Sequence, residues 1–453
     1  MRLIVAANRA PYIIKKNKNF TRVEKSPGGL VAALDVVMKK TKGVWVCSSK
    51  ENDFYNLKLP YEIRPIALTD LENYHYYEGF GNRQIWPLFH YFPTRYKLHE
   101  EDWKFYVKVN QKFANQIFSF VKPDDIIWLH DYHLMLVPGM LRKAGVTNKI
   151  GFFLHIPFPN HEIFRIIPRS ESILKGLLSC DVIGFHTETY QKHFLECVKK
   201  QISAVEIDAT NNQIFYKNRT TKAVAHPISI DFNLISKLAK NKCVQNKAEE
   251  LRNMLQADII GLGVDRLDYT KGLFEKLNGI ESFLDSYPEF HKKFIFIQIA
   301  VPSRVEVPEY QKLKKEIDET VGRINGKFSV DGWSPISYIY NSLNIKDLIS
   351  YYSCADFALV TALRDGLNLV AKEYIASKVN NDGMLILSEF TGAAEELNTG
   401  NHINPYDGKS IAAGILRSIT TSRKEKEKIM TNLRQHIKTN DIYKWVDKFL
   451  CQL

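Results

Sequence analysis

Cysteine is scarce in this chain and does not occur in paired motifs. The six cysteines are spread over 453 residues, without a C-x-x-C pair. In a chain of this size that usage indicates reduced thiols in a cytosolic protein. No apolar run approaches the length of a membrane span, and the first residues turn polar too soon for a signal peptide. We therefore expect a cytoplasmic protein with no membrane partner.

The chain also lacks a concentrated basic segment, although its charge is positive. The formal net charge is +12, from 62 Lys and Arg against 50 Asp and Glu. This excess favours anionic partners, such as phosphorylated metabolites, nucleic acid or acidic lipid. The basic residues form only short clusters, Lys15–Lys18 and Arg423–Lys428, and these are not interleaved with aromatic residues. Nucleic acid is therefore not expected as a partner.

Metal-ligand spacing is the third feature that the sequence does not show. His130, Asp131 and His133 lie close together, but no H-x-x-x-H motif or carboxylate set completes a ligand shell around them. The sequence therefore predicts a site without a metal ion.

What the chain does contain is a regular alternation of short apolar runs and amphipathic segments. The apolar runs begin with Leu3–Ala7 in the first half and with Ile259–Val264 in the second. The length suits two α/β domains on a prior of about 150 residues each. We predict two Rossmann-like domains facing across a cleft, residues 1–225 and 226–439. The apolar positions near the end predict a helix that returns to the first domain, so about 440–453 belongs with it.

The segment 360–374 reads as the end of a buried strand, a charged turn and the start of a helix. Asp365 lies in the turn, Leu369 opens the predicted helix, and Glu373 falls in its early turns. In an open α/β sheet, ligands bind beyond the carboxyl ends of the strands. A helix start offers N–H groups to a phosphate, and a carboxylate one turn later can accept from sugar hydroxyls. The alternative is an N-cap Asp followed by a solvated Glu.

Arg266 and Lys271 follow the strand Ile259–Val264 and lie five residues apart. An arginine can bind phosphate through two parallel N–H bonds, and a lysine adds a compact charge. Together with Glu373 and Asp365, these groups suit a sugar nucleotide, with the diphosphate on the cations and the hydroxyls on carboxylates and backbone.

Two features of the first half could also bind a ligand. A polar, lysine-rich loop is expected after the first strand, and Gly28 and Gly29 then precede a predicted helix, which would let backbone approach a phosphate. A tight turn explains the glycines as well, but Arg9 at the end of the first strand makes a phosphate site more credible. The aromatic segment 74–91 contains Tyr77 and Trp86. Aromatic clusters more often form core, yet these rings could form a wall for a sugar.

Eleven motifs extend these local patterns over the chain. They are N-R at Asn8–Arg9, S-x-G-G-L at Ser26–Leu30, W-P-L-F-H-Y at Trp86–Tyr91, H-D-Y-H-L at His130–Leu134, G-F-F-L-H-I-P-F-P at Gly151–Pro159, G-F-H-T at Gly184–Thr187, V-D-R-L-D-Y-T-K-G at Val264–Gly272, Q-I-A-x-x-S-R at Gln298–Arg304, G-R-I-N-G at Gly322–Gly326, L-R-D-G-L-N-L-V-A-K-E-Y at Leu363–Tyr374 and N-P-Y-D at Asn404–Asp407. With them the chain resembles the trehalose-6-phosphate synthases from Leu3 to about Leu450. These are retaining glucosyltransferases of the two-Rossmann-domain GT-B architecture.

The resemblance implies substrates and roles for individual residues. The donor would be UDP-glucose, or another nucleoside-diphosphate glucose, and the acceptor glucose 6-phosphate. The donor-binding residues would be Gly29, Arg266, Lys271, Asp365, Leu369, Val370 and Glu373. The acceptor-binding residues would be Arg9, Tyr77, Trp86, Asp131 and Arg304, with both arginines on the phosphate. The catalytic residues would be Asp131, His155, Arg266, Lys271 and Glu373, without a metal or cofactor.

The mechanism that follows from the resemblance is substrate-assisted. The departing diphosphate oxygen would take the proton of the attacking hydroxyl on the same face, so that configuration is retained. Arg266 and Lys271 would stabilise the charge that grows on the leaving group.

Some positions depart from the family pattern and keep alternatives open. Gly81, Arg83 and Gln84 stand where the family usually has Ser and apolar residues, and Ser229 stands where Gly is common. One alternative is a related synthase with another phosphorylated acceptor, such as glycerol 3-phosphate, which would make it a glucosylglycerol-phosphate synthase. Another is a catalytically silent sugar-phosphate sensor, although a sensor would be expected to lack some of the donor-binding residues. Whether the chain forms a homo-oligomer is left open.

Overall fold

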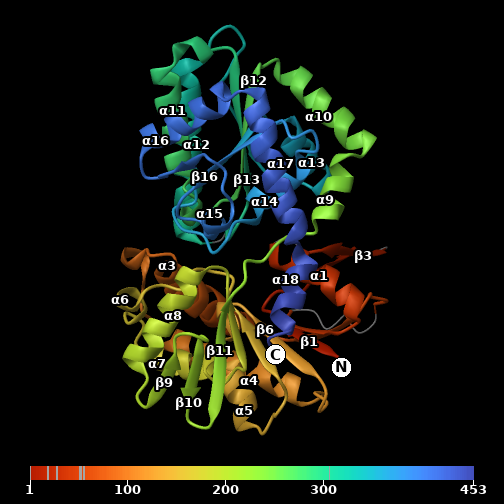
Figure 1. Ribbon diagram of the computed structural model, residues 1–453, viewed down its shortest axis with the longest axis vertical. Helices are drawn as coiled ribbons and strands as arrows, with labels where there is room; N and C mark the ends of the chain where they lie inside the picture. The colour runs from red at the N-terminus through yellow and green to blue at the C-terminus, as the bar shows by residue number, and fades with distance from the viewer. Residues whose placement is uncertain (1, 18–19, 27–28, 50–53, 55–56, 306) are drawn as a thin grey trace. The chain divides into compact units, whose positions relative to one another are not determined.

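The computed structural model divides the chain into two compact units (Figure 1). Unit 1 comprises Met1–Ile228 and Tyr443–Leu453, and unit 2 comprises Ser229–Ile442. The structure describes residues 2–17, 20–26, 29–49, 54, 57–305 and 307–453. The predicted glycine-rich turn falls partly on residues 27 and 28, which lie outside the described residues.

Unit 1 is built on a nine-stranded sheet with the order β5-β4-β1-β6-β7-β8-β11-β10-β9. Its first six positions follow the doubly wound order 3-2-1-4-5-6, and every pair from β5 to β11 is parallel. Most of these strands are buried, which explains their uninterrupted apolar sequences. The strands are β1 Leu3–Ala6, β4 Val44–Ser48, β5 Glu62–Ile66, β6 Ile126–His130, β7 Ile150–Phe153, β8 Val182–Phe185, β9 Val205–Asp208, β10 Gln213–Tyr216 and β11 Arg219–Ala225.

Helices connect these strands, and the last helix of the chain also belongs to unit 1. They are α1 Gly29–Thr41, α2 Asp70–Asn73, α3 Trp86–Phe89, α4 Glu100–Phe118, α5 Val137–Lys143, α6 His161–Phe164, α7 Ser170–Leu177, α8 Glu188–Gln201 and α18 Ile442–Leu450, with the short turns η3 Pro93–Arg95 and η4 Tyr132–Leu134. In α18, Phe449 stacks on Trp128 at 4.9 Å between ring centroids, and Trp445 meets Phe153 edge-on. The apolar side of α18 therefore packs against β6 and β7.

Two segments of unit 1 differ from the sequence-based expectation. The lysine-rich stretch after β1 is an antiparallel hairpin, β2 Tyr12–Asn17 and β3 Phe20–Lys25, rather than a loop. Tyr12 and Ile14 are buried on one side of it while Ile13 is exposed, so alternation governs a stretch whose lysines suggest a loop. The second segment is η2, Tyr74–Ile85, which forms a π-helix of 12 residues. Such helices are rare and are found frequently at functional sites.

Unit 2 has a six-stranded, fully parallel sheet with the order β14-β13-β12-β15-β16-β17, again the doubly wound order. Its strands are β12 Ile259–Arg266, β13 Phe294–Val301, β14 Ile336–Tyr340, β15 Phe357–Val360, β16 Met384–Ser388 and β17 His402–Ile403. The prediction of an α/β fold with two Rossmann-like halves is confirmed by these two sheets.

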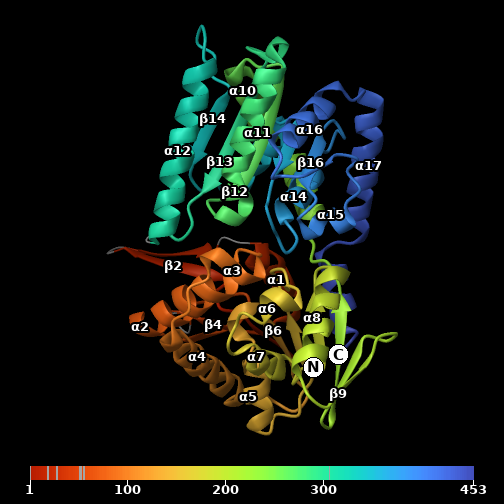
Figure 2. The ribbon, with the colours of Figure 1, turned by 90° about the vertical axis from the view of Figure 1, so that its left-hand side faces the viewer.

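Helices cover both faces of the unit 2 sheet. Figure 1 shows α11 and α16 on one side of β12 and β13, and α10 and α13 on the other. Figure 2 shows the long α12 beside α11. The helices are α9 Phe232–Ala239, α10 Lys242–Leu255, α11 Leu273–Ser286, α12 Pro308–Phe328, α13 Ile345–Cys354, α14 Leu369–Ser377, α15 Gly392–Glu396, α16 Gly408–Thr420 and α17 Arg423–Thr439, with the turns η5 Tyr269–Lys271 and η6 Pro288–Phe290. Among the helices the structure describes, none is long and apolar enough to cross a membrane.

Candidate active site

In unit 2, predicted donor residues meet where the strand order reverses, between β12 and β15. Arg266 ends β12, and Lys271 ends the turn η5 that follows it. Lys271 Nζ lies 2.6 Å from Asp365 Oδ2, and both side chains are largely buried. Gly272 has φ +62°, and a Cβ there would lie 2.3 Å from the Thr361 carbonyl oxygen, so the turn packs directly against the end of β15. The reversal point of such a sheet is the usual ligand site.

The start of α14 completes this arrangement. Asn368 has φ 94° and caps the helix, accepting the Ala371 N–H at 3.1 Å and donating to Asp365 Oδ2 at 3.1 Å. Leu369 and Val370 are the first two residues of α14, where backbone N–H groups have no partner within the helix. Those N–H groups and the positive end of the helix dipole suit a phosphate.

Glu373 lies one turn into α14 and is mostly surrounded by protein. Burial raises its pKa from 4.5 to about 7, although a hydrogen bond donated by the Tyr352 hydroxyl to Oε2, at 3.1 Å, acts in the opposite direction. A carboxyl group in this state can hold or release a proton near neutral pH. The sequence did not point to Tyr352, because it lies 21 residues away in α13.

Arg304 was predicted to bind an acceptor phosphate. In the structure its guanidinium forms an ion pair with the carboxylate of Asp268. Nη1 donates to Asp268 Oδ2 at 3.1 Å, and the hydroxyl of Tyr310 donates to the same oxygen at 3.2 Å. Burial acts to raise the pKa of Asp268, but Arg304 and then Arg266 outweigh it and hold this pKa at about 2. Asp268 therefore stays ionised, and the phosphate role of Arg304 stays a prediction.

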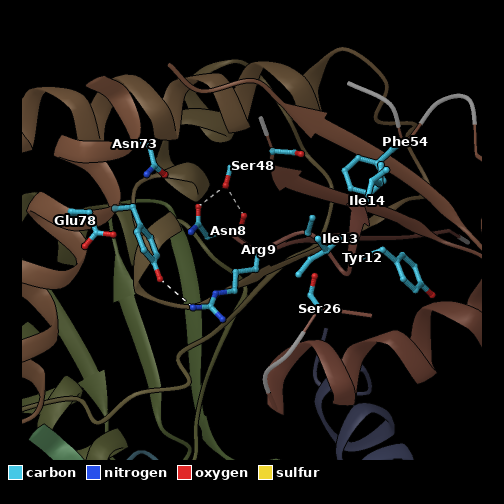
Figure 3. A pocket seen from close by; sticks show the side chains of 13 residues that line it. Asn8, Arg9, Tyr12, Ile13, Ile14, Ser26, Ser48, Phe54, Asn73 and Glu78 are labelled. Carbon is cyan, nitrogen blue, oxygen red and sulfur yellow. Dashed lines mark hydrogen bonds between the residues drawn. The ribbon is translucent and has the colours of Figure 1, made fainter. Parts of the chain in front are cut away.

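In unit 1, Arg9 and Tyr77 line a pocket with a volume of about 460 Å³ (Figure 3). Arg9 Nη2 donates to the Tyr77 hydroxyl at 3.2 Å. Ser48 Oγ donates to the carbonyl oxygen of Asn8 at 2.7 Å, which ties the end of β1 to the end of β4. The other lining residues are Asn8, Ala10, Tyr12, Ile13, Ile14, Ser26, Ser48, Ser49, Phe54, Asn73 and Glu78. The pocket thus offers a guanidinium and an aromatic hydroxyl beside apolar surface.

The structure separates the two predicted wall residues. Tyr77 stacks on His133, with 5.5 Å between ring centroids, and lines the pocket. Trp86 is 5% exposed, packs on His90 and Tyr132, and is not among the residues that line this pocket. In the described structure Trp86 is therefore part of the aromatic core.

Arg83 and Gln84, which depart from the family pattern, are bound to a buried carboxylate. Arg83 Nη2 lies 3.2 and 3.1 Å from the two oxygens of Asp102, and Gln84 Nε2 donates to Asp102 Oδ2 at 3.1 Å. His75 Nδ1 also lies 2.8 Å from Asp102. Asp102 is fully buried in α4, so these three side chains serve to hold η2 against α4.

Asp131 and His155 come together after β6 and β7. Asp131 has φ 72° and ψ 167°, a conformation that is nearly restricted to glycine and costs about 1–3 kcal/mol. Its Oδ1 accepts the backbone N–H of His155 at 3.3 Å. Strain of this kind clusters at active sites. His130, the preceding residue, contacts the ring of His155, a contact the sequence did not reveal.

The remaining predicted donor residue, Gly29, opens α1. Gly29, Arg9, Tyr77, Trp86, Asp131 and His155 belong to unit 1, whereas Arg266, Lys271, Arg304, Asp365, Leu369, Val370 and Glu373 belong to unit 2. Within the described parts of the chain, no three His, Cys, Asp or Glu residues form a group that could hold a metal ion.

Comparison with known proteins identifies relatives over the whole chain. The UDP-forming α,α-trehalose-phosphate synthase A of Dictyostelium discoideum is 40% identical over 461 residues, covering 100% of this chain and 62% of that protein. The chain thus spans less than two thirds of that relative. The UDP-forming α,α-trehalose-phosphate synthase of Yarrowia lipolytica is 38% identical and is covered to 99%, again with 100% of this chain.

Solved structures of similar proteins match the fold closely. The E. coli protein bound with UDP-2-fluoro glucose has a TM-score of 0.91 and 34% identity, covering 100% of this chain and 98% of that one. The α,α-trehalose-phosphate synthase of Burkholderia xenovorans in complex with glucose 6-phosphate has a TM-score of 0.91 and 32% identity, covering 99% of each chain. These matches confirm the expected GT-B fold class. The model of glycosyltransferase family 20 matches residues 1–453, and the chain belongs to that family.

Proposed function

We propose that this protein is a UDP-forming α,α-trehalose-phosphate synthase, which transfers glucose from UDP-glucose to glucose 6-phosphate with retention of configuration. The observation that carries the proposal is the cluster at the reversal point of the unit 2 sheet. There Lys271, Asp365 and the start of α14 lie together, and Glu373 follows one turn later. This set suits a diphosphate next to sugar hydroxyls.

The reaction forms one bond and breaks another at C1 of the donor glucose. The C1 hydroxyl oxygen of the acceptor bonds to C1 of the donor glucose, and the bond from that carbon to the diphosphate oxygen breaks. The hydroxyl proton passes to the departing diphosphate. Arg266, Lys271 and the N–H groups of Leu369 and Val370 would stabilise the charge that grows on this leaving group.

Unit 1 would hold the acceptor. Arg9 supplies the phosphate contact and Tyr77 a hydroxyl and a ring face, while contact of Trp86 with the sugar stays a prediction for a side chain that is 5% exposed. Asp131 and His155 would lie at the reacting sugar, and Gly29 over the donor phosphates. Binding of the acceptor phosphate by Arg304 would require its guanidinium to share or leave Asp268.

The acceptor is best tested by supplying UDP-glucose with glucose 6-phosphate, free glucose or glycerol 3-phosphate and measuring UDP release. We expect glucose 6-phosphate to be preferred over both others, since it alone has both a phosphate for Arg9 and a ring for Tyr77. Equal rates with free glucose would contradict the phosphate contact. Preference for glycerol 3-phosphate would contradict the aromatic wall.

Arg9 and Arg83 form a matched pair for a second experiment. Arg9→Ala should raise the KM for glucose 6-phosphate by about 10-fold or more, because a charge-assisted contact to phosphate is lost. Arg83→Ala should keep the acceptor preference but lower the free energy of unfolding by about 2–4 kcal/mol, since the buried Asp102 loses a partner. Kinetics and chemical unfolding of both variants check this. An altered acceptor preference in Arg83→Ala would support the alternative of another phosphorylated acceptor, such as glycerol 3-phosphate.

A cytoplasmic location is also part of the proposal. It is supported by the six cysteines, which are all free thiols.

A further inference from the structure

His130 is the last residue of β6 and is fully buried beside His155. Its Nδ1 lies 3.0 Å from His155 Nε2. The next residue, Asp131, accepts the backbone N–H of His155. The dipeptide His130–Asp131 therefore holds His155 at two points, the ring and the backbone.

The contact between the rings restricts where their protons lie. A hydrogen bond between Nδ1 and Nε2 needs a proton on only one of these two atoms. His130 Nε2 is buried and has no hydrogen-bond partner among the described residues. If His130 accepted at Nδ1, its own proton would sit on Nε2 as a buried N–H without an acceptor, which native proteins rarely contain. His130 therefore donates from Nδ1.

His155 then accepts at Nε2, so its own proton lies on Nδ1. This holds while both rings are neutral, and their surroundings favour neutrality. Burial lowers the pKa of both His130 and His155. The neighbouring His155 lowers the pKa of His130 further, and His186 does the same to the pKa of His155. The packed neighbours are mainly aromatic, with Trp128 4.6 Å from His130 and Phe153 4.8 Å from His155 between ring centroids. Asp131, the residue after His130, accepts the backbone N–H of His155.

We propose that His130 is a positioning residue that fixes the orientation and tautomer of His155, so that His155 presents an Nδ1–H donor to an oxygen of the transferred hexosyl group. The placement of His155 at that group rests on the proposed function. A neutral donor is suited to this position, because an imidazolium would repel the positive charge that develops on the sugar during transfer.

The tautomer can be measured without turnover. In ¹⁵N NMR of the ring nitrogens, with His155 assigned by comparison with His155→Phe, the wild-type protein should show a protonated Nδ1 and an unprotonated Nε2. His130→Phe keeps an aromatic ring but removes the donor, and should abolish that pattern. A protonated Nε2 on His155 in the wild-type protein would overturn the proposal.

Kinetics provide the second readout. His130→Phe should lower kcat by about 10- to 100-fold with little change in the KM for glucose 6-phosphate, and His130→Asn, which keeps an N–H donor near the Nδ1 position, should recover most of the loss. His193→Phe is the matched control. His193 is a partly buried histidine of unit 1 whose ring contacts the Phe158 carbonyl oxygen rather than the ring of His130 or His155. Wild-type kcat in His130→Phe would also overturn the proposal.

If His130→Phe does not fold, the ¹⁵N spectrum of the wild-type protein and the kcat of His130→Asn test the proposal in its place. If the wild-type protein shows the Nδ1–H tautomer but forms no product, the proposed function fails while the tautomer assignment stands.

Discussion

Replacing Arg266 or Lys271 with alanine is expected to lower turnover by about 10²-fold or more. Arg266 ends β12 and Lys271 ends the turn after it, at the reversal point of the unit 2 sheet, and Lys271 Nζ lies 2.6 Å from Asp365 Oδ2. Each would face the diphosphate, whose negative charge grows as the glycosidic bond breaks. Preorganised cations stabilise such a transition state more than the ground state, so the effect should appear in kcat and not only in KM. Steady-state UDP release measures both constants.

A lysine remote from the site provides the control for this experiment. Lys312 in α12 is 79% exposed and lies 3.7 Å from Glu316, so Lys312→Ala should leave kcat unchanged. Lys271→Ala also removes the ammonium group beside Asp365. Thermal unfolding curves of all variants should therefore be compared, to give the fraction of folded protein at the assay temperature. Near-normal kcat in both Arg266→Ala and Lys271→Ala, with the proteins folded, would remove these residues from the proposed donor site.

Glu373→Gln is expected to lower kcat/KM for UDP-glucose by about 10- to 100-fold, because an ionised carboxylate binds sugar hydroxyls more strongly than an amide. The pKa of Glu373 is about 7, so in the wild-type protein kcat/KM should rise as the pH increases through that value. The variant cannot ionise at this position, so its profile should be flat there. A wild-type profile without this step, or an unchanged one in the variant, would contradict the assignment.

The same carboxyl group should make the protein less stable at higher pH. Its pKa is raised from 4.5 to about 7 on folding. Between these values the folded protein holds a proton that the unfolded chain releases, so the free energy of unfolding falls as the pH rises through this window. Glu373→Gln should therefore be more stable than the wild-type protein at pH 8, by about 1–3 kcal/mol, and similar to it at pH 4. Chemical unfolding at the two pH values tests this, and a less stable variant at pH 8 would contradict it.

The parts of the fold that follow from local pattern were predicted from the sequence. β1, β6, β12 and β15 are short apolar runs, because a parallel strand covered on both faces has no polar side. Their alternation with amphipathic segments indicated two doubly wound sheets. Charged residues just after β12 and β15 indicated the candidate site, since ligands bind at the carboxyl ends of strands.

The parts that depend on tertiary partners were not predicted. Arg83 was one of the departures from the family pattern that kept another phosphorylated acceptor open, but its partner Asp102 lies on another helix, and only folding brings them together. Asp268 and Arg304 are 36 residues apart and form a buried ion pair for the same reason. The hairpin β2–β3 was not predicted, because a polar, lysine-rich sequence is typical of a loop, although Tyr12 and Ile14 are buried on one side of it. The π-helical form of η2 has no signature in composition.

The product of the reaction shows directly which bond this protein makes. Proton NMR of a mixture of protein, UDP-glucose and glucose 6-phosphate resolves the anomeric signals of the sugar that forms. We expect a 1,1-linked disaccharide phosphate with two α-configured anomeric centres, released with an equal amount of UDP. A β-configured transferred glucose would contradict retention. UDP release without a disaccharide phosphate, or no reaction at all, would contradict the proposed synthase activity.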